Sequence, residues 1–517
     1  MRQLTKVIPN RSYMEYVRFE LKLMHPFLSK AAQIFILSCL LVFSSCGRKA
    51  YMKALQQPIS QKDLDTDAVH EDLDLLHQAI EDIVPFTYLY SDSLTIAQTY
   101  TSVKGEGQQS IMEFYGNVLE LLGSYNASHF FIEFPYEQYR QKLLEQQQGI
   151  FPFYCSLEND VLHIDQTFIK ADSTFKDYEL IQINGFDADS LFKSFYKYVG
   201  GSKTTKHYDV RAKFHQLLWL NGIAGPFTFL FTNKQGARIE KIHQGYFYPK
   251  KPKETTTAAT RVNALEDYIQ YKQLDSQTAC IKINAFYGYA QKEYEAFLKE
   301  TFQKIKANST TRLVIDLRGN GGGDDRLCSM LLHYLTDKPY RFYGGQHRKV
   351  SKQYNQYFRY ASNNGWLLRQ VPYGPGVALF FSRHPTESKT FSSPKVGKEI
   401  KLQKVKDNSL RFQGTCYFII DNGTYSSAVS LANAVEDYNL GTLVGQPSGS
   451  IPNEHGEIMN FKLPNSGLMI YLPSAFYVRA NGDITNPNPV LPKMLIPRRT
   501  LAKMSTSEVA EYIKQAN

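Results

Sequence analysis

Residues 416–437, CYFIIDNGTYSSAVSLANAVED, hold the strand and helix around which we expect the rest of the chain to fold. An apolar strand breaks at Asp421-Asn422-Gly423, and a helix with apolar side chains at helical spacing begins at Ser426. A serine at a helix start commonly caps the helix by accepting a backbone hydrogen bond. The position also suits a nucleophile, because free N–H groups and the helix dipole favour an oxyanion there. Taken alone, the segment leaves both roles open for Ser426.

A second apolar strand also runs into a glycine-rich turn. Residues 313–323 read LVIDLRGNGGG, and a helix is expected to follow. Glycines allow positive φ angles and expose successive N–H groups, which suits an anion or an oxyanion. No Lys-Ser/Thr pair follows Gly323, and the spacing is not Gly-x-Gly-x-x-Gly, so phosphate-loop and dinucleotide motifs are excluded. An ordinary tight turn fits the glycines equally well.

Strands and helices alternate through this half of the chain, which predicts an α/β core with parallel strands over residues 263–517. The expected strands are 279–283, 312–317, 415–420 and 441–445, and the expected helices are 291–307, 325–336 and 426–437.

The preceding part of the chain divides into regions of different pattern. Residues 47–148 are predicted to form a helical cap, with amphipathic helices at 66–83 and 109–122. Residues 149–250 read as short strands and turns, and IQINGFDADSLF at 181–192 resembles a segment of PDZ domains. An unrelated small β domain is the alternative. Residues 251–262 are polar and are expected to be a linker.

The N-terminus is predicted to be an export signal. The apolar run 31–45, AAQIFILSCLLVFSS, follows basic residues and is too short to span a bilayer comfortably. The residues ending in Cys46 resemble a bacterial lipoprotein signal, with Phe43 where leucine is usual. We therefore expect residues 1–46 to be the signal, Cys46 to be lipidated, and the protein to be attached to the bacterial cell envelope. A plain signal peptide or a single anchor helix is the alternative.

Composition excludes several classes of function. The chain has 517 residues, enough for about three domains, and a formal net charge of +10. Residues 1–46 supply six Lys/Arg against two Glu, so +4 of this charge lies in the predicted signal. The rest is scattered and no base-stacking motif is evident, which argues against a nucleic-acid or glycan binder. The cysteines lack Cys-x-x-Cys spacing, and no metal or other cofactor is expected.

Three motifs in fixed order resemble the C-terminal processing (tail-specific) peptidase family and its tricorn-core relatives. They are the turn at 313–323, the helix start at 416–437 and GTLVGQPSG at 441–449. The resemblance implies a Clp protease/crotonase-like core, preceded here by a degenerate PDZ-like domain and the helical cap. It implies that Ser426 is the nucleophile and that the N–H groups of Gly322 and Ser427 form the oxyanion hole. Asp316 and Arg318 are then expected to hold the turn.

The general base departs from the best-known branch of that family. Its lysine, 25 residues after the serine, is replaced here by Ile451, so a standard Ser–Lys dyad is ruled out. The tricorn-like branch uses a Ser-His pair, and Ser128-His129 in GSYNASHFFIEF (123–134) corresponds to it. A histidine can deprotonate a serine near neutral pH and return the proton to the leaving amine. His129 is therefore the expected base, Ser128 its orienting partner, and His455 the second choice.

The branch also carries a glutamate, and the corresponding stretch here is GDITNPNPVLP at 482–492. Thr485 stands where the glutamate would fall, and Asp483 or Glu457 could take its place. The resemblance implies an exported serine peptidase that cleaves peptides or protein tails through an acyl-enzyme. The missing lysine and glutamate keep a second hypothesis open, namely a catalytically inactive, peptide-binding lipoprotein of the same family.

Overall fold

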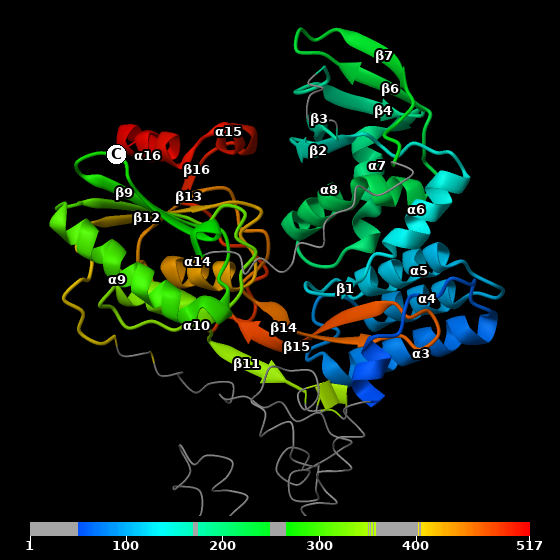
Figure 1. Ribbon diagram of the computed structural model, residues 1–517, viewed down its shortest axis with the longest axis horizontal. Helices are drawn as coiled ribbons and strands as arrows, with labels where there is room; N and C mark the ends of the chain where they lie inside the picture. Colours follow the sequence, from blue (N-terminus) through cyan, green and yellow to red (C-terminus); the bar gives the residue numbers. More distant parts are fainter. Residues whose placement is uncertain are drawn as a thin grey trace, which may run out of the picture.

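A computed structural model describes residues 50–168, 174–248, 265–349 and 405–516, together with residues 351, 353, 354, 356, 357 and 402. The predicted signal with Cys46 and the predicted linker 251–262 lie outside the described residues. Among the described residues, no helix is both long and apolar enough to cross a membrane. Figure 1 shows two lobes, with the α/β core on one side and the cap and β domain on the other.

The core is built on a six-stranded sheet, in the order β16-β13-β12-β10-β9-β8. All neighbouring pairs are parallel except β8–β9. The alternation read from the sequence is therefore confirmed, and the observed strands start or end within one residue of those expected. The strands are β8 Ile269–Gln273, β9 Thr278–Ile283, β10 Arg312–Asp316, β12 Thr415–Ile420, β13 Thr442–Gly445 and β16 Met494–Leu495.

Helices cover both faces of this sheet, as is usual for parallel strands that are apolar on both sides. On one face Leu298, Leu331 and Leu431 pack with strand residues in a single buried cluster. On the other face Val509 and Ile513 cover Val314. The first layer contains α9 Gln291–Ala307, α10 Asp325–His333 and α14 Ser427–Tyr438, and the second contains α15 Arg498–Lys503 and α16 Thr506–Ala516.

The β domain has an antiparallel sheet in the order β2-β3-β4-β6-β7, with β5 beside β4. The Asn184-Gly185 turn has positive φ angles at both residues and joins β4 to β5, the geometry that favours this dipeptide in hairpins. The PDZ-like assignment stays a prediction. The elements are β2 Phe153–Glu158, β3 Val161–Thr167, β4 Glu179–Ile183, β5 Phe186–Asp187, α7 Ala188–Ser194, α8 Lys203–Leu220, β6 Phe227–Thr232 and β7 Arg238–His243.

The cap is helical, as its periodicity predicted. Helix α3 (Thr66–Ile83) has the expected bounds, and α5 (Ile111–Ser124) starts with a capping box between Ser110 and Glu113. The cap also contains α4 Ser93–Lys104, the two-residue strand β1 Phe131–Ile132 and α6 Tyr136–Glu145.

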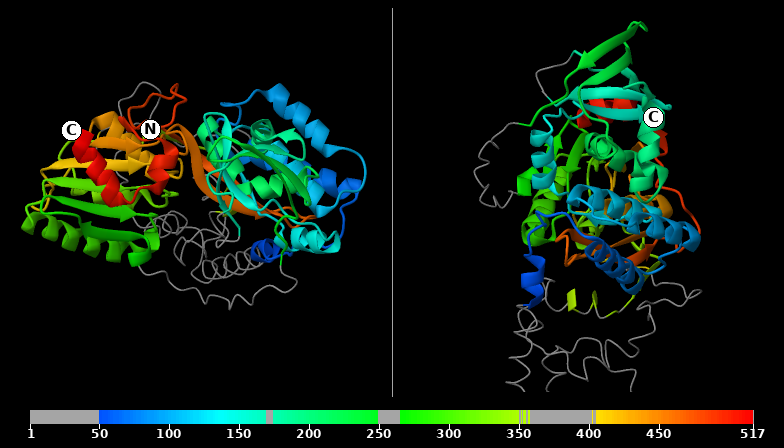
Figure 2. Two further views of the ribbon diagram at one scale, coloured as in Figure 1. Left: turned by 90° about the horizontal axis from the view of Figure 1, so that it is seen from above. Right: turned by 90° about the vertical axis from the view of Figure 1, so that its right-hand side faces the viewer.

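A long hairpin, absent from the sequence analysis, connects the lobes. Strands β14 (Glu454–Lys462) and β15 (Met469–Val478) leave the core and run into the cap, where β15 pairs with β1. The other end of β15 pairs with β11 (Gly345–Arg348). The buried residues Met459, Leu463, Leu468, Ile470 and Leu472 belong to the apolar core of the cap and β domain. Figure 2 shows the hairpin passing between the lobes.

Candidate active site

Ser426 lies between β12 and α14 with φ 54° and ψ −128°. A non-glycine residue in this region costs about 1–3 kcal/mol and persists only where surrounding structure holds it. An ordinary N-cap residue has an extended backbone and a side chain that accepts an N–H from the first turn. Ser426 has neither, since its side chain forms no capping hydrogen bond. The geometry therefore argues against the capping role and leaves the hydroxyl available at a helix N-terminus.

Buried polar side chains hold the two catalytic loops against each other. The Asn320 side chain donates to the Ile283 carbonyl and accepts the Gly322 N–H, both at 2.9 Å, and the Asn320 carbonyl accepts the Tyr425 N–H. Asp421 accepts the N–H groups of Gly319 and Gly423 at 2.9 Å each. The bonds from Gly319 to Asp421 and from Tyr425 to Asn320 cross from one loop to the other, and the remaining bonds fix each loop internally or to the end of β9.

Asp316 and Arg318 hold the turn, as expected. The Arg318 guanidinium donates to Asp316 at 2.6 and 2.9 Å and to the carbonyl oxygens of Leu501 and Met504. Asp316 is fully buried beneath it. The pair therefore anchors the C-terminal helices to the glycine turn, which leaves no room for a role in chemistry.

Gly322 packs directly against the nucleophile. A Cβ at this position would lie 2.7 Å from the Ser426 Cβ, and its φ is +98°, so only glycine fits without strain. Its expected role as oxyanion donor does not fit this conformation, because its N–H is engaged by Asn320. Within the described part of the chain, the N–H groups of Gly323 and Ser427 have no hydrogen-bond partner. The N–H groups of Ser427 and Gly323 are therefore free to donate to a ligand beside Ser426, whereas that of Gly322 is not.

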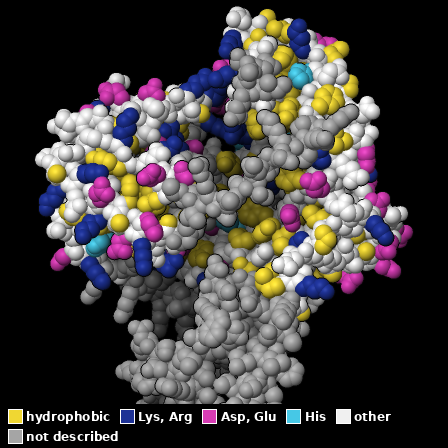
Figure 3. All heavy atoms as spheres, viewed as in Figure 1, with side chains coloured by type: hydrophobic (Ala, Val, Ile, Leu, Met, Phe, Trp, Pro, Cys, Tyr) yellow, Lys and Arg dark blue, Asp and Glu magenta, His cyan; other side chains and the backbone are white. Residues whose placement is uncertain are grey.

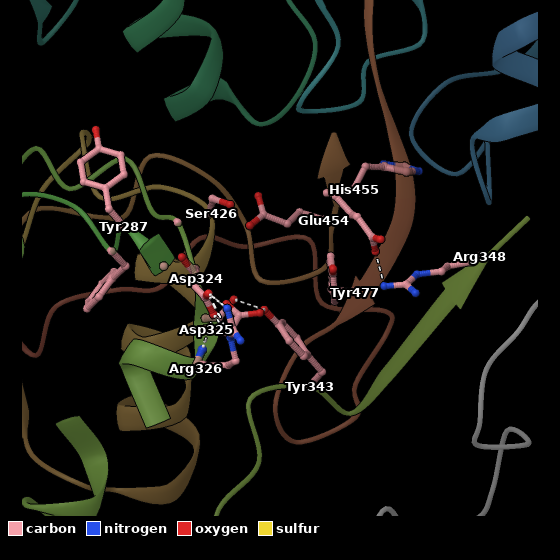
Figure 4. A pocket seen from close by; sticks show the side chains of 17 residues that line it. Tyr287, Asp324, Asp325, Arg326, Tyr343, Arg348, Ser426, Glu454, His455 and Tyr477 are labelled. Atoms are coloured by element: carbon pink, nitrogen blue, oxygen red, sulfur yellow. Dashed lines mark hydrogen bonds and ion pairs between the residues drawn. The ribbon is translucent and has the colours of Figure 1, made fainter. Parts of the chain in front are cut away.

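Ser426 opens into a cavity of about 750 Å³ at the junction of the core and the hairpin. Figure 4 shows the Glu454 carboxylate directed toward Ser426, while the His455 ring points away from it. Aromatic and charged side chains line much of the remaining wall, including Arg348 from β11, Tyr477 from β15 and Tyr343 from the loop before β11. The cavity is therefore open to substrate and lined for contact with a polar chain.

His129 lies immediately before β1, with φ 67° and only 7% of its surface exposed. Its Nδ1 is 3.2 Å from the Ser128 Oγ, so the expected Ser-His pair is formed. Its ring lies against Tyr425, with the centroids 4.8 Å apart, next to the nucleophile in sequence. No hydrogen bond joins His129 to Ser426 among the described residues. Burial, together with the nearby His455, lowers the pKa of His129 to about 3.

Glu454 is the residue that sequence reasoning missed. Its Oε2 lies 3.9 Å from the His129 Nδ1, both side chains are at most 7% exposed, and this oxygen has no hydrogen-bond partner among the described residues. Burial raises the pKa of Glu454 to about 8. At neutral pH the contact is therefore between a neutral imidazole and a protonated carboxyl. An ion pair forms only when a proton moves to His129.

His455, the second choice for the base, is turned toward the cap. Its Nε2 donates to the Pro85 carbonyl at 2.7 Å and its ring packs on Phe476. Burial lowers its pKa to about 4. Successive residues of a strand face opposite sides, so β14 presents Glu454 to Ser426 and His455 to the cap. Recognising 454–462 as a strand would have separated the two.

The residues proposed as replacements for the family glutamate lie elsewhere. Thr485 and Asp483 are exposed and hydrogen-bond to each other through the Thr485 N–H and the Asp483 carboxylate at 3.0 Å. Neither lines the cavity. Glu457 does line it, but its carboxylate pairs with Arg348. Glu454 thus occupies the position beside the histidine that these residues were expected to fill.

A comparison with models of protein families matches part of this chain. Residues 277–496 match the model of peptidase family S41. The S41 region contains both loops, Ser426 and Glu454, whereas His129 lies outside it. No curated protein sequence matches the chain.

Two solved structures share the fold beyond the S41 region. Mature CPAF complexed with lactacystin has 14% identity and a TM-score of 0.60, covering 87% of this chain and 97% of that chain. Mature CPAF alone has 15% identity and a TM-score of 0.59, covering 87% and 96%. Sequence identities this low support similarity of fold only. They confirm a mixed α/β fold that includes the cap and β domain as well as the S41 region.

Proposed function

We propose that this protein is a serine peptidase that cleaves peptide bonds through an acyl-enzyme on Ser426. The observation that carries the proposal is the strained, non-capping backbone of Ser426, which opens into a cavity at the start of α14. Strain of this kind is retained where the position has a use. Family S41 membership of residues 277–496 implies peptide or protein substrates.

His129 is the proposed base. It takes the proton from the Ser426 Oγ as that oxygen attacks the scissile carbonyl, and it gives the proton to the leaving amine as the C–N bond breaks. In the second step His129 takes a proton from the attacking water and returns it to the Ser426 Oγ as the acyl bond breaks. Catalytic hydrogen bonds are commonly long in the free enzyme, and here His129 has to move toward Ser426 to form one.

Glu454 is the proposed partner of the imidazolium. A buried histidine with a lowered pKa gains a proton readily only if a negative charge lies nearby. The Glu454 carboxylate, 3.9 Å away, supplies that charge once it has lost its own proton. The N–H groups of Ser427 and Gly323, next to the nucleophile, are the proposed donors to the tetrahedral oxyanion.

The setting proposed for this activity is the bacterial cell envelope. The export signal and the lipid on Cys46 follow from residues 1–46 and would keep the peptidase at a membrane surface. Substrates would then be exported peptides or loose ends of envelope proteins.

A fluorophosphonate probe tests the proposal. The parent protein without the predicted signal, residues 1–46, is expected to be labelled and to degrade a denatured protein. Ser426→Ala should abolish labelling and His129→Ala should slow it strongly. Thermal unfolding of each variant confirms that it is folded. Labelling that persists in Ser426→Ala would refute the nucleophile, and an unlabelled parent that still binds the denatured protein would favour the inactive, peptide-binding alternative.

A further inference from the structure

A second cavity, of about 720 Å³, lies between the β domain and the core. Figure 3 shows Lys and Arg side chains gathered around the hollow between the two lobes. Its lining includes three carboxylates, Asp165, Asp177 and Asp421. It also includes seven cationic side chains, Lys176, Arg211, Lys282, Arg318, Arg498, Arg499 and Lys503. We call this cavity the cationic cleft.

Four of these cations, Arg211, Arg318, Arg499 and Lys503, form ion pairs within the protein itself and therefore need no ligand. Arg318 pairs with Asp316, and Arg499 pairs with Asp177 at 2.5 Å. Arg211 pairs with Asp165 at 2.9 Å. The carboxylates of the cleft are thus already neutralised or, in the case of Asp421, held by backbone N–H groups.

Arg498 has no such partner. Its guanidinium donates only to the His207 Nε2, at 2.9 Å, and within the described part of the chain no carboxylate lies within ion-pair distance of it. Burial and the neighbouring Arg211 lower the pKa of Arg498, while the more distant Asp165, Glu158 and Asp421 act in the opposite direction. Lys282, across the cleft on β9, also has no ion-pair partner among the described residues. A partly buried guanidinium is stabilised best by a carboxylate or another planar anion.

The cleft and the active-site cavity meet at the same two loops. Gly319 and Gly423 line the cleft, whereas Gly323 and Ser426 line the active-site cavity. Two residues lie between Gly423 and Ser426, so the Cα atoms of Gly423 and Ser426 are at most about 11 Å apart. The cleft therefore begins within a few residues' length of Ser426.

We propose that the cationic cleft binds acidic side chains of the polypeptide substrate, a few residues from the bond that is cleaved. The proposal rests on the peptidase function proposed above for the neighbouring cavity. Arg498 and Lys282 are the residues that bind, and Arg211 and Arg499 add to the positive potential. Sequences rich in Asp or Glu beside the cleavage point would then be preferred.

A polypeptide fits this cleft better than a nucleic acid. A nucleic acid carries a charge on every phosphate and is bound along a continuous basic groove with aromatic stacking. Here three carboxylates interrupt the positive surface, and Tyr208 is the one aromatic side chain that lines the cleft within the described residues.

Equilibrium binding to full-length Ser426→Ala protein tests the proposal without cleavage. Two fluorescent peptides are compared that differ only in four Glu or four Gln residues on one flank, and both are amidated so that no terminal carboxylate contributes. We expect the acidic peptide to bind at least about tenfold more tightly and to lose most of this advantage at high salt. Adding Arg498→Gln should weaken binding of the acidic peptide by at least about fivefold, whereas Arg498→Lys should weaken it less.

The controls separate this cleft from general surface charge. Arg238→Gln, on the exposed face of β7, should leave binding unchanged, and Lys282→Gln provides a second test if Arg498→Gln proves unstable to heat. Equal affinities for the two peptides, or equal effects of Arg238→Gln and Arg498→Gln, would overturn the proposal. Displacement by a single-stranded oligonucleotide at lower concentration than the acidic peptide would overturn the choice of ligand. Failure of the peptidase function would appear separately, as a parent that the fluorophosphonate does not label.

Discussion

The two halves of the candidate site are held in different ways. The core half, with Ser426 and the glycine turn, is fixed by hydrogen bonds within its two loops and by at least three between them, which join Gly319 to Asp421, Tyr425 to Asn320 and Thr424 to Leu317. The cap half, with Ser128 and His129, is held to the core through the hairpin, where β1 pairs with β15 and the Pro85 carbonyl accepts a hydrogen bond from His455. A rigid nucleophile thus faces a base that is delivered by a long hairpin. The difference implies that any rearrangement needed for catalysis occurs on the cap side.

Removal of the nucleophile should have the largest effect. Ser426→Ala is expected to lower kcat/KM by roughly 10⁴-fold or more, because the acyl-enzyme can no longer form. Fold stability should change by less than about 1 kcal/mol, since the hydroxyl makes no hydrogen bond to another described residue. Single-turnover kinetics and thermal unfolding measure the two. If Ser426→Ala retained a tenth of the parent activity, Ser426 could not be the nucleophile.

Separate replacement of His129 and His455 by alanine compares the two candidates for the general base. His129→Ala should lower kcat by about 10²- to 10⁴-fold, the usual contribution of a general base. His455→Ala should mainly reduce stability, because it leaves the Pro85 carbonyl without its donor. If His455→Ala, measured well below its unfolding temperature, proves the more damaging to kcat, the base must be reassigned.

Glu454→Gln should change the pH profile. In the parent, kcat/KM is expected to rise through the Glu454 pKa of about 8, because only the carboxylate stabilises the imidazolium. The variant should lack this rise and fall about tenfold below the parent at pH 9, with little difference at pH 6. Glu457→Gln is the matched control and should keep the rise. Identical profiles for Glu454→Gln and the parent would exclude Glu454 as partner of His129.

Glu454→Gln, which should lower activity, is expected to raise the stability of the folded protein. Between the ordinary glutamate pKa of about 4.5 and the raised pKa of about 8, the native protein keeps a proton that the unfolded chain has lost. Glu454 therefore costs the parent up to about 1.4 kcal/mol per pH unit over this range. The melting temperature of Glu454→Gln relative to the parent should rise from pH 5 to pH 8. A constant difference would show that Glu454 titrates normally.

The smallest effects are expected at the residues first considered as replacements for the family glutamate. Asp483→Asn and Thr485→Ala should each change kcat/KM by less than about twofold, because both side chains are exposed and outside the cavity. Steady-state kinetics on one peptide is sufficient. A tenfold loss of kcat/KM in either variant would show that this loop, and not Glu454, supplies the third residue of the site.

Much of the core half could be predicted from sequence because its determinants are local. The apolar strand, the Asp-Asn-Gly break and the helix period define the surroundings of Ser426 within 22 residues. The glycine turn was recognised for the same reason. What local pattern could not give was the engagement of the Gly322 N–H by Asn320, since a side chain's choice of partner depends on the packed loop.

The cap half could be predicted only by resemblance. Strand β1 has two residues and pairs with residues 340 positions later, so nothing in its own pattern identifies its partner. The strand character of 454–462 was overlooked because its burial does not alternate along its length. Glu454 was therefore missed, although its neighbours His455 and Glu457 were both considered.

The hairpin also sets an order in time. During synthesis the Ser128-His129 pair is made long before the strand that will hold it, and β15 is complete only when residue 478 has been added. Until then the histidine and the serine belong to parts of the chain that have no connection in space. An unfinished or unfolded chain cannot assemble the two halves of the site.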